Sequence, residues 1–128
     1  MRSRYAVALS ILVGTVIGGA AVQTLHAQMK PPVYLIAQNE VTNPEAYLKE
    51  FSIPTLASVK AAGGRYLVLG GKITPLDGTP PKTRIVIQVW DSMEKLQAWY
   101  NSPEFESIRK IGMKHATFHT FAVEGVAE

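Results

Sequence analysis

The order of strand-like and helix-like segments constrains the fold of this chain more than any other feature. Beyond residue 30, runs rich in β-branched and aromatic residues alternate with runs of helical periodicity, and glycine and proline mark the boundaries between them. The runs that predict strands are, in chain order, Val33–Val41, Arg65–Ile73, Thr83–Trp90 and Thr117–Val123. A helical region follows the first of these strands and another follows the third.

Both helical regions carry recognisable start and stop signals. Thr42-Asn43-Pro44 combines a capping side chain with a proline near the first helical position, and Gly63-Gly64 provides a glycine for a left-handed cap at the end. Pro54 lies inside this pattern, so we expect the helix to kink or split just before it. Asp91-Ser92 caps the second region, and Pro103 starts a further short helix.

The resulting order, strand–helix–strand–strand–helix–strand, is the ferredoxin-like arrangement of the α+β class. It predicts an antiparallel four-stranded sheet with two helical regions on one face. Such a sheet has its other face open, because two helices cover one side only.

Side-chain alternation divides each strand into two faces. In Thr83–Trp90 one face is aliphatic, with Ile85, Ile87 and Val89, and the other is mixed, with Val86, Gln88 and Trp90. The first strand divides similarly into Val33, Leu35, Ala37 and Tyr34, Ile36, Gln38. We expect the aliphatic faces to pack against the helices. The mixed faces would then need a partner, and a second copy of the chain is the simplest one, which predicts a homodimer of dimeric α/β-barrel type.

The first 27 residues have the parts of a secretory signal. Arg2 and Arg4 make a positive start, Tyr5–Val22 is uncharged and mostly apolar, and Ala27 offers a cleavage point. The uncharged span is also nearly as long as the ~20 residues of a membrane helix, so an uncleaved N-terminal anchor is the alternative. Either way the sequence predicts an exported domain over residues 30–126, periplasmic or secreted.

Composition excludes several classes of function. Without Arg2 and Arg4 the chain has eleven basic and ten acidic residues, and it has no dense basic stripe of the kind that binds nucleic acid. The absence of cysteine excludes disulfides, thiol catalysis and thiolate metal sites. No dinucleotide-binding or P-loop pattern indicates a cofactor.

Three stretches resemble the DUF1330 family, which belongs to the wider dimeric α/β-barrel group. They are EVTNPEAY (Glu40–Tyr47), GGRYLVLGGK (Gly63–Lys72) and WDSMEKLQAWYNSPEF (Trp90–Phe105), with VEGV (Val123–Val126) near the end. The resemblance covers Val33 to Val126 and implies the ferredoxin-like fold and dimerisation. The family has no established activity, so the resemblance implies no chemistry.

The glycine pairs of GGRYLVLGGK predict structure rather than phosphate binding. A phosphate loop joins a strand to a helix N-terminus, whereas Gly63-Gly64 joins a helix to a strand and Gly70-Gly71 ends a strand. Arg65 is a better candidate for a ligand contact. By alternation it lies with Leu67 and Leu69, opposite Tyr66 and Val68, where it could bind a carboxylate or pair with an acidic residue of the partner.

Histidine provides the only candidate for acid–base chemistry. His115 and His119 are four residues apart, but the chain leaves a helix and enters a strand between them, which argues against a shared metal site. His119 alternates with Thr117 and Phe121, so it could project into the space between two sheets and act as an acid or base. A hydrogen-bonded interface histidine is the alternative.

The sequence therefore leaves three hypotheses. The first is a small exported dimer that binds a small, partly apolar molecule in the cavity between its two sheets, at Tyr34, Gln38, Arg65, Trp90 and His119. The second is a cofactor-light oxygenase or isomerase of the barrel group with His119 as its catalytic residue. The third is a purely structural or stress-related dimer whose interior is filled.

Overall fold

The structure is a computed structural model, and it describes residues 30–127. The strands are β1 (Val33–Val41), β2 (Arg65–Leu69), β3 (Arg84–Trp90), β4 (Ala116–Thr117) and β5 (Thr120–Glu124). The helices are α2 (Pro44–Tyr47), a π-helical stretch (Leu48–Ser52), α3 (Ile53–Ala62), α4 (Met93–Tyr100) and α5 (Pro103–Gly112). The predicted export segment, residues 1–27, lies outside the described residues.

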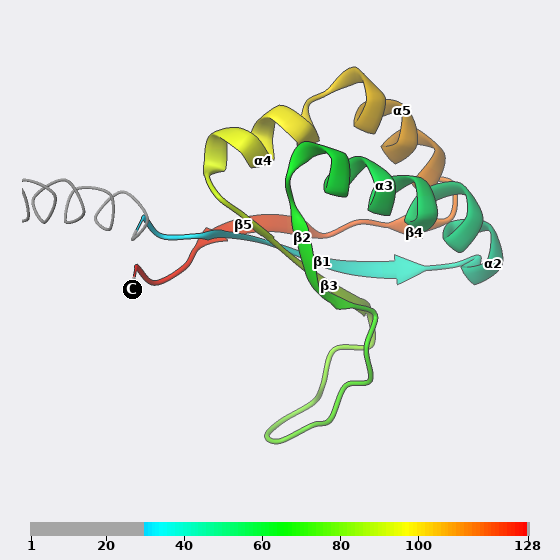
Figure 1. Cartoon of the computed structure of the whole chain (residues 1–128). Coiled ribbons are helices and arrows are strands. Elements are labelled where there is room, and N and C mark those ends of the chain that lie inside the picture. The colour runs from blue at the N-terminus through cyan, green and yellow to red at the C-terminus, as the bar shows by residue number, and fades with distance from the viewer. Residues whose placement is uncertain (1–29, 128) are drawn as a thin grey trace, which may run out of the picture. The chain divides into compact units, whose positions relative to one another are not determined.

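The strands form one antiparallel sheet in the order β2-β3-β1, with β4 and β5 both paired to the free side of β1. Glu40 pairs with Thr117 and Ala37 with Thr120, so β4 and β5 continue one register along β1. The helices cover one face of the sheet, and the loop between β2 and β3 projects away from them (Figure 1). The predicted ferredoxin-like α+β fold is confirmed.

The first helical region begins and breaks where the sequence predicts. The side chain of Asn43 accepts a hydrogen bond from the backbone N–H of Ala46, and Pro44 takes the first helical position. The π-helical stretch then ends just before Pro54, which has no N–H to continue the regular pattern. Gly63 ends α3 in the left-handed conformation, with φ of 99°.

The second helical region is capped twice by serine. Ser92 accepts a hydrogen bond from the N–H of Lys95 at the start of α4, and Ser102 accepts one from Phe105 at the start of α5. Both helices turn aromatic side chains toward the sheet. The ring centroids of Trp99 and Phe105 lie 4.1 Å apart, which joins the two helices into one layer.

The predicted orientation of the third strand is wrong. Gln88 pairs with Leu35 and Trp90 with Val33, so the mixed face of β3 lies under the helices and its aliphatic face is open. The side chains of Trp90 and Gln88 are hydrogen-bonded to each other inside the core, because Trp90 Nε1 donates to Gln88 Oε1 at 2.9 Å. The Trp90 ring also lies 5.3 Å from that of Trp99. Alternation separates the two faces of a strand but does not say which one the helices cover.

The second strand is shorter than predicted and contains a bulge. Tyr66 pairs with Gln88 and Val68 with Ile87, so Leu67 is the extra residue. The bulge reverses the alternation beyond it. Leu69 therefore shares the helix-covered face with Tyr66, and its predicted place beside Arg65 is wrong. The strand ends at Gly70, whose φ is 65°.

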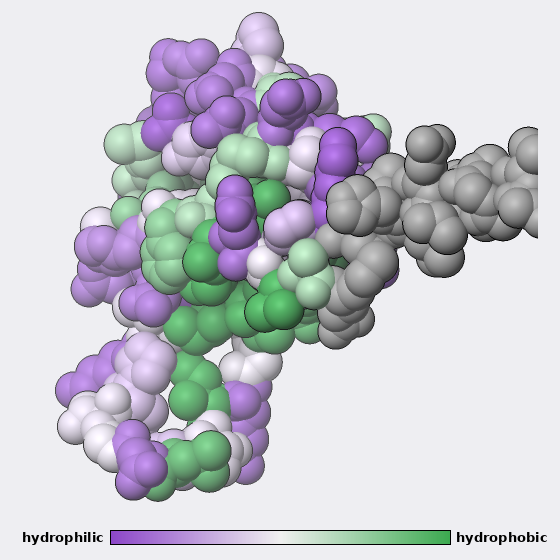
Figure 2. Space-filling view, turned by 90° about the vertical axis from the view of Figure 1, so that its left-hand side faces the viewer, coloured by the Kyte–Doolittle hydropathy of each residue, from purple (hydrophilic) through white to green (hydrophobic). Residues whose placement is uncertain are grey.

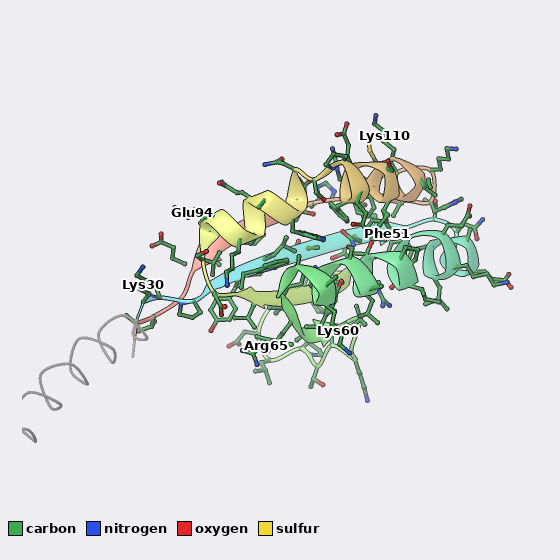
Figure 3. All side chains as sticks on the ribbon, turned by 45° about the horizontal axis from the view of Figure 1, so that its top comes forward. Lys30, Phe51, Lys60, Arg65, Glu94 and Lys110 are labelled. Atoms are coloured by element: carbon green, nitrogen blue, oxygen red, sulfur yellow. The ribbon has the colours of Figure 1, made fainter. Side chains whose placement is uncertain are left out.

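The core lies between the sheet and the helices. Its buried hydrophobic residues come from every layer of the domain and include Val33, Leu35, Tyr47, Phe51, Val59, Trp90, Trp99 and Phe105. Phe51 lies between the two helical regions, above β1 (Figure 3). Within residues 30–127, no helix has the length and hydropathy needed to cross a membrane.

Candidate functional site

A small pocket, the inner pocket, lies between the helix layer and the sheet. Its volume is about 50 Å³, and it extends from β2 across the middle of the sheet to β5. Its walls are mainly apolar and aromatic, with Leu35 and Val86 from the sheet and Phe51 and Phe105 from the helices. On the same measure one water needs roughly 10–15 Å³, so the inner pocket has room for a few heavy atoms.

Polar atoms in the wall of the inner pocket lack partners within the protein. Asn39 Oδ1, Thr55 Oγ1 and Arg109 Nε are all buried and have no hydrogen-bond partner. Asn39 is itself fixed in place, because its Nδ2 donates to the hydroxyl of Tyr47 at 2.9 Å. A buried polar atom without a partner costs about 1–3 kcal/mol, so these atoms favour an occupant that offers hydrogen bonds.

Tyr66 contributes a hydroxyl to the same pocket. Burial raises the pKa of Tyr66 to about 12, although the hydrogen bond from Gln88 opposes the shift. Gln88 Nε2 lies 3.4 Å from the hydroxyl oxygen and donates to it, so the phenol proton is free to donate to another group. At neutral pH Tyr66 is a neutral hydrogen-bond donor at the β2 side of the pocket.

Arg109 lies where the inner pocket meets a wider outer recess. This outer recess has a volume of about 370 Å³ and lies between α5 and strands β4 and β5. It shares Tyr100, Arg109, Phe118 and Thr120 with the inner pocket. The guanidinium carbon of Arg109 lies 5.4 Å from the centroid of the Tyr100 ring, which holds the side chain at the junction. These shared side chains separate the inner pocket from the outer recess.

Four of the predicted site residues lie on the open face of the sheet, away from this pocket. Tyr34 pairs with Val89 and Gln38 is next to Ile85, both in the open-face row of β3. Arg65 also pairs with Val89, at the β2 edge of the sheet (Figure 3). His119 lies beside Gln38 on the other side of β1, since its carbonyl accepts from the Gln38 N–H.

Trp90 is not with these four residues. Its side chain is 1% exposed and belongs to the core under the helices, so it cannot wall a cavity on the open face. The structure therefore brings together Tyr34, Gln38, Arg65 and His119 on one face and separates Trp90 from them. The predicted role of Trp90 in the site is therefore wrong, because β3 turns this side chain toward the helices.

The two histidines contact different carboxylates. His119 Nε2 lies 2.8 Å from Glu40 Oε2 on the open face, where both side chains are more than half exposed. His115 Nε2 lies 2.8 Å from Glu50 Oε2, an ion-pair distance whose geometry does not make a hydrogen bond. Among the described residues, no three His, Asp or Glu side chains gather to hold a metal ion.

One signal in the sequence points to the inner pocket, although none of the predicted site residues lies there. Asn39 continues the row Val33, Leu35 and Ala37, and a polar residue in an otherwise buried row is a candidate site residue. Gln88 is likewise a polar residue in the buried row of β3. Thr55 and Arg109 carry no such signal, because helical position alone does not separate a pocket wall from a surface.

Solved structures with the same fold come from several bacteria. A protein of unknown function from Rhodopseudomonas palustris superposes with a TM-score of 0.61 at 11% identity, covering 85% of this chain and 94% of that one. A putative antibiotic biosynthesis monooxygenase from Caulobacter crescentus CB15 gives 0.56 at 17% identity, covering 81% and 98%. SnoaB, a cofactor-independent oxygenase from Streptomyces nogalater, gives 0.51 at 12% identity, covering 73% and 91%.

At these identities the similarity shows the fold, which is that of the antibiotic biosynthesis monooxygenase and dimeric α/β-barrel proteins. No curated protein matches the sequence. The family described as "Domain of unknown function (DUF1330)" matches residues 32–126, and this chain belongs to it.

Proposed function

We propose that the protein binds a small, partly apolar molecule in the inner pocket, under the helices of each protomer. This differs from the expected position between two sheets. The observation that carries the proposal is that Asn39, Thr55 and Arg109 line one apolar pocket and that each has a buried polar atom without a protein partner. A pocket with apolar walls and a few unpaired polar groups is the usual form of a small-molecule site.

The polar groups specify the hydrogen bonds that the ligand makes. Asn39 Oδ1 accepts, whereas Tyr66 and Arg109 donate, so a hydroxyl group, which does both, matches them. The inner pocket, at about 50 Å³, is smaller than the ~150 Å³ cavity that binds benzene in an engineered protein. A ring-sized ligand would therefore extend toward Arg109 and the outer recess.

Binding of phenol, as a ring with one hydroxyl group, tests this proposal. Ala37 lines the inner pocket from β1, and a leucine there would occupy the space with extra carbon atoms. We expect Ala37→Leu to weaken phenol binding at least tenfold in isothermal titration calorimetry. Ala57→Leu is the matched control, because Ala57 is exposed on α3 and does not line the pocket.

The two variants separate a specific site from general apolar adsorption. Equal loss of phenol affinity in Ala37→Leu and Ala57→Leu would contradict the proposal, and so would unchanged affinity in both. Circular dichroism and urea unfolding show whether Ala37→Leu keeps the fold, because overpacking a core costs about 1–3 kcal/mol.

We also propose that the open face of the sheet pairs with a second copy of the chain. Partly or largely exposed apolar side chains from four strands support this, namely Ile36, Val68, Ile85, Ile87, Phe121 and Val123. Apolar residues gather at the level of the sheet, whereas the outer surface of the helices is mostly hydrophilic (Figure 2). Contiguous apolar surface of this kind marks an interface.

The enzyme hypothesis has no specific support at His119. The residue is on the open face, paired with Glu40, and the inner pocket lies on the other side of the sheet. The similarity to an oxygenase, at 12% identity, shows a shared fold and is no evidence for a shared activity. Ligand binding is therefore the function that the pocket supports best.

Export remains part of the proposal, on the sequence pattern of residues 1–27. It is tested by the intact mass of the protein recovered from the periplasm and from the membrane fraction. A periplasmic species that has lost about 27 residues supports cleavage, whereas a full-length species in the membrane supports an anchor. A full-length species confined to the cytoplasm would contradict export.

A further inference from the structure

A second recess, the basic recess, lies at the end of the sheet where β2 leads into the long loop. Its volume is about 530 Å³, within the range of ~300–1,000 Å³ typical of ligand sites. One side is apolar, with Val41, Pro44 and Leu48, and the other carries Lys82 and Arg84. Gly70 and Gly71 form part of its floor. It therefore combines an apolar wall with two cations.

The guanidinium of Arg84 is held between two flat surfaces. Its carbon atom lies 5.7 Å from the centroid of the Tyr47 ring. The guanidinium also lies close to Gly70. A methyl group added to Gly70 would collide with the guanidinium atoms Nη1 and Cζ. Gly70 is thus required twice, for its φ of 65° and for the close approach of Arg84. The contacts fix the orientation of the arginine in advance.

Two polar side-chain atoms at the recess have no hydrogen-bond partner in the protein. Arg84 Nε and Thr83 Oγ1 are buried without a hydrogen-bond partner. Within residues 30–127, no carboxylate lies within 4.0 Å of the charged nitrogens of Arg84 or Lys82, because the ion pairs found there involve other residues. A structural arginine normally has an acidic or carbonyl partner, so an oriented arginine without one is arranged to bind an anion.

We propose that the basic recess binds the carboxylate of a small organic acid with an apolar body. Arg84 provides the planar fork that matches a carboxylate, and Lys82 adds a second positive charge. The apolar body of the acid lies against Leu48, which is 51% exposed in the absence of a ligand, and against Pro44. This site is separate from the inner pocket, and only the ring of Tyr47 borders both.

The apolar wall distinguishes an organic acid from inorganic phosphate. Phosphate could use the two cations but would leave Leu48 and Pro44 exposed to water. Burial of apolar surface contributes roughly 25 cal/mol per Å², so an acid that covers this wall binds more tightly than a small inorganic anion of equal charge.

Benzoate, benzamide and inorganic phosphate are the probes, titrated against the full domain and followed by NMR chemical shifts of the backbone amides. Benzamide has the shape of benzoate without its charge. We expect benzoate to shift the amides of Gly70, Gly71 and Thr83 and to bind at least tenfold more tightly than either benzamide or phosphate. Equal affinities for benzoate and phosphate, or for benzoate and benzamide, would overturn the assignment.

Variants then identify the residue responsible. Arg84→Gln should weaken benzoate binding at least tenfold, and Arg84→Lys should fall between this variant and the wild type, because it keeps the charge and loses the fork. Lys60→Gln is the control for net charge, since Lys60 is exposed on α3 (Figure 3). Unfolding in urea checks the fold of each variant, and Arg84→Lys keeps the test valid if Arg84→Gln is unfolded.

The glycine pair supplies an independent test. Gly70→Ala should displace Arg84 and weaken benzoate binding, whereas Gly71→Ala should leave it unchanged, because no atom lies within 4 Å of a methyl group at Gly71. Benzoate affinity that is the same in Gly70→Ala and Gly71→Ala contradicts the role given to Arg84. A change in oligomeric state on Arg84→Gln with unaltered benzoate affinity would show a contact between subunits instead.

Discussion

The two faces of the sheet both carry apolar side chains but differ in what these side chains contact. The helix-covered face combines large aromatic and amide side chains, with Gln88 and Trp90 hydrogen-bonded to each other in the core. The open face is mostly aliphatic, and its few polar residues lie toward the ends of the strands. The buried face therefore contains polar amide side chains as well as apolar ones, which is less usual than polar residues on an exposed face.

The difference is explained by what each face contacts. A helix layer leaves irregular spaces over a twisted sheet. The Trp90 ring fills such a space beside Gly64, at the place that a side chain on residue 64 would otherwise take. An aliphatic face such as that of Ile85 and Ile87 can pack against a second sheet with a matching twist. This difference is the basis for proposing a ligand site on one face and an interface on the other.

The largest effect is expected from Trp90→Ala. Trp90 is among the largest fully buried side chains, so its removal should lower the free energy of unfolding by about 3–5 kcal/mol. Phe121→Ala, on the open face, should cost about 1 kcal/mol or less in dilute protein, because Phe121 is 50% exposed. Urea unfolding at low concentration measures both. Equal losses of unfolding free energy in the two variants would contradict the difference in burial between the two faces.

The substitution Ile87→Lys tests the open face itself. Ile87 is partly exposed in the protomer, so a lysine there should be tolerated by the fold but not by a second sheet. We expect the dimer to dissociate at least a hundredfold more readily, as measured by light scattering across a concentration series. Ala57→Lys, on the outer surface of α3, is the control. A wild-type protein that stays monomeric at micromolar concentrations would contradict the interface.

Gly64→Ala should disturb the covered face alone. A methyl group at Gly64 would lie 2.6 Å from Trp90 Cζ2 and 2.8 Å from Val59 Cγ1, so one of these side chains must move. Overpacking of this kind lowers stability by about 1–3 kcal/mol. Gly71→Ala, which meets nothing within 4 Å, should change the unfolding free energy by less than about 0.5 kcal/mol. A stable Gly64→Ala protein would contradict the packing described for Trp90.

The smallest effect is expected from the ionisation of Tyr66. Its pKa in the folded protein is raised to about 12, whereas an unfolded tyrosine titrates near 10. The folded state thus keeps a proton that the unfolded state loses, and stability falls as pH rises from about 10 to about 12. The loss should be about 1–2 kcal/mol, reduced by partial exposure. Urea unfolding between about pH 8 and about pH 12 measures this loss, and Tyr66→Phe should not show it. Identical curves of unfolding free energy against pH for the two proteins would contradict the burial of the phenol.

Local signals in the sequence were sufficient for the fold but not for the site. Asn43, Ser92, Gly63 and Pro54 act through their nearest neighbours along the chain, so their effects on helix ends could be predicted. The face of β3 that meets the helices depends on long-range packing around Trp90, which alternation does not encode.

The candidate site shows the same limit. Four of the five predicted residues do share a face, because alternation is reliable within β1 and at the ends of β2 and β5. The bulge at Leu67 and the void beside Asn39 arise from contacts between elements. A pocket is defined by space that side chains fail to fill, and no single segment determines that space.

The position of the ligand under the helices is tested most directly by methyl NMR during a titration with phenol. Adjacent residues of β3 report on opposite faces of the sheet. Val86 lines the inner pocket, and Ile87 is next to it on the open face. We expect phenol to shift the methyl resonances of Val86 and Leu35 and to leave those of Ile87 and Ile85 unchanged. Shifts at Ile85 and Ile87 with none at Val86 would place the ligand on the open face and contradict the account.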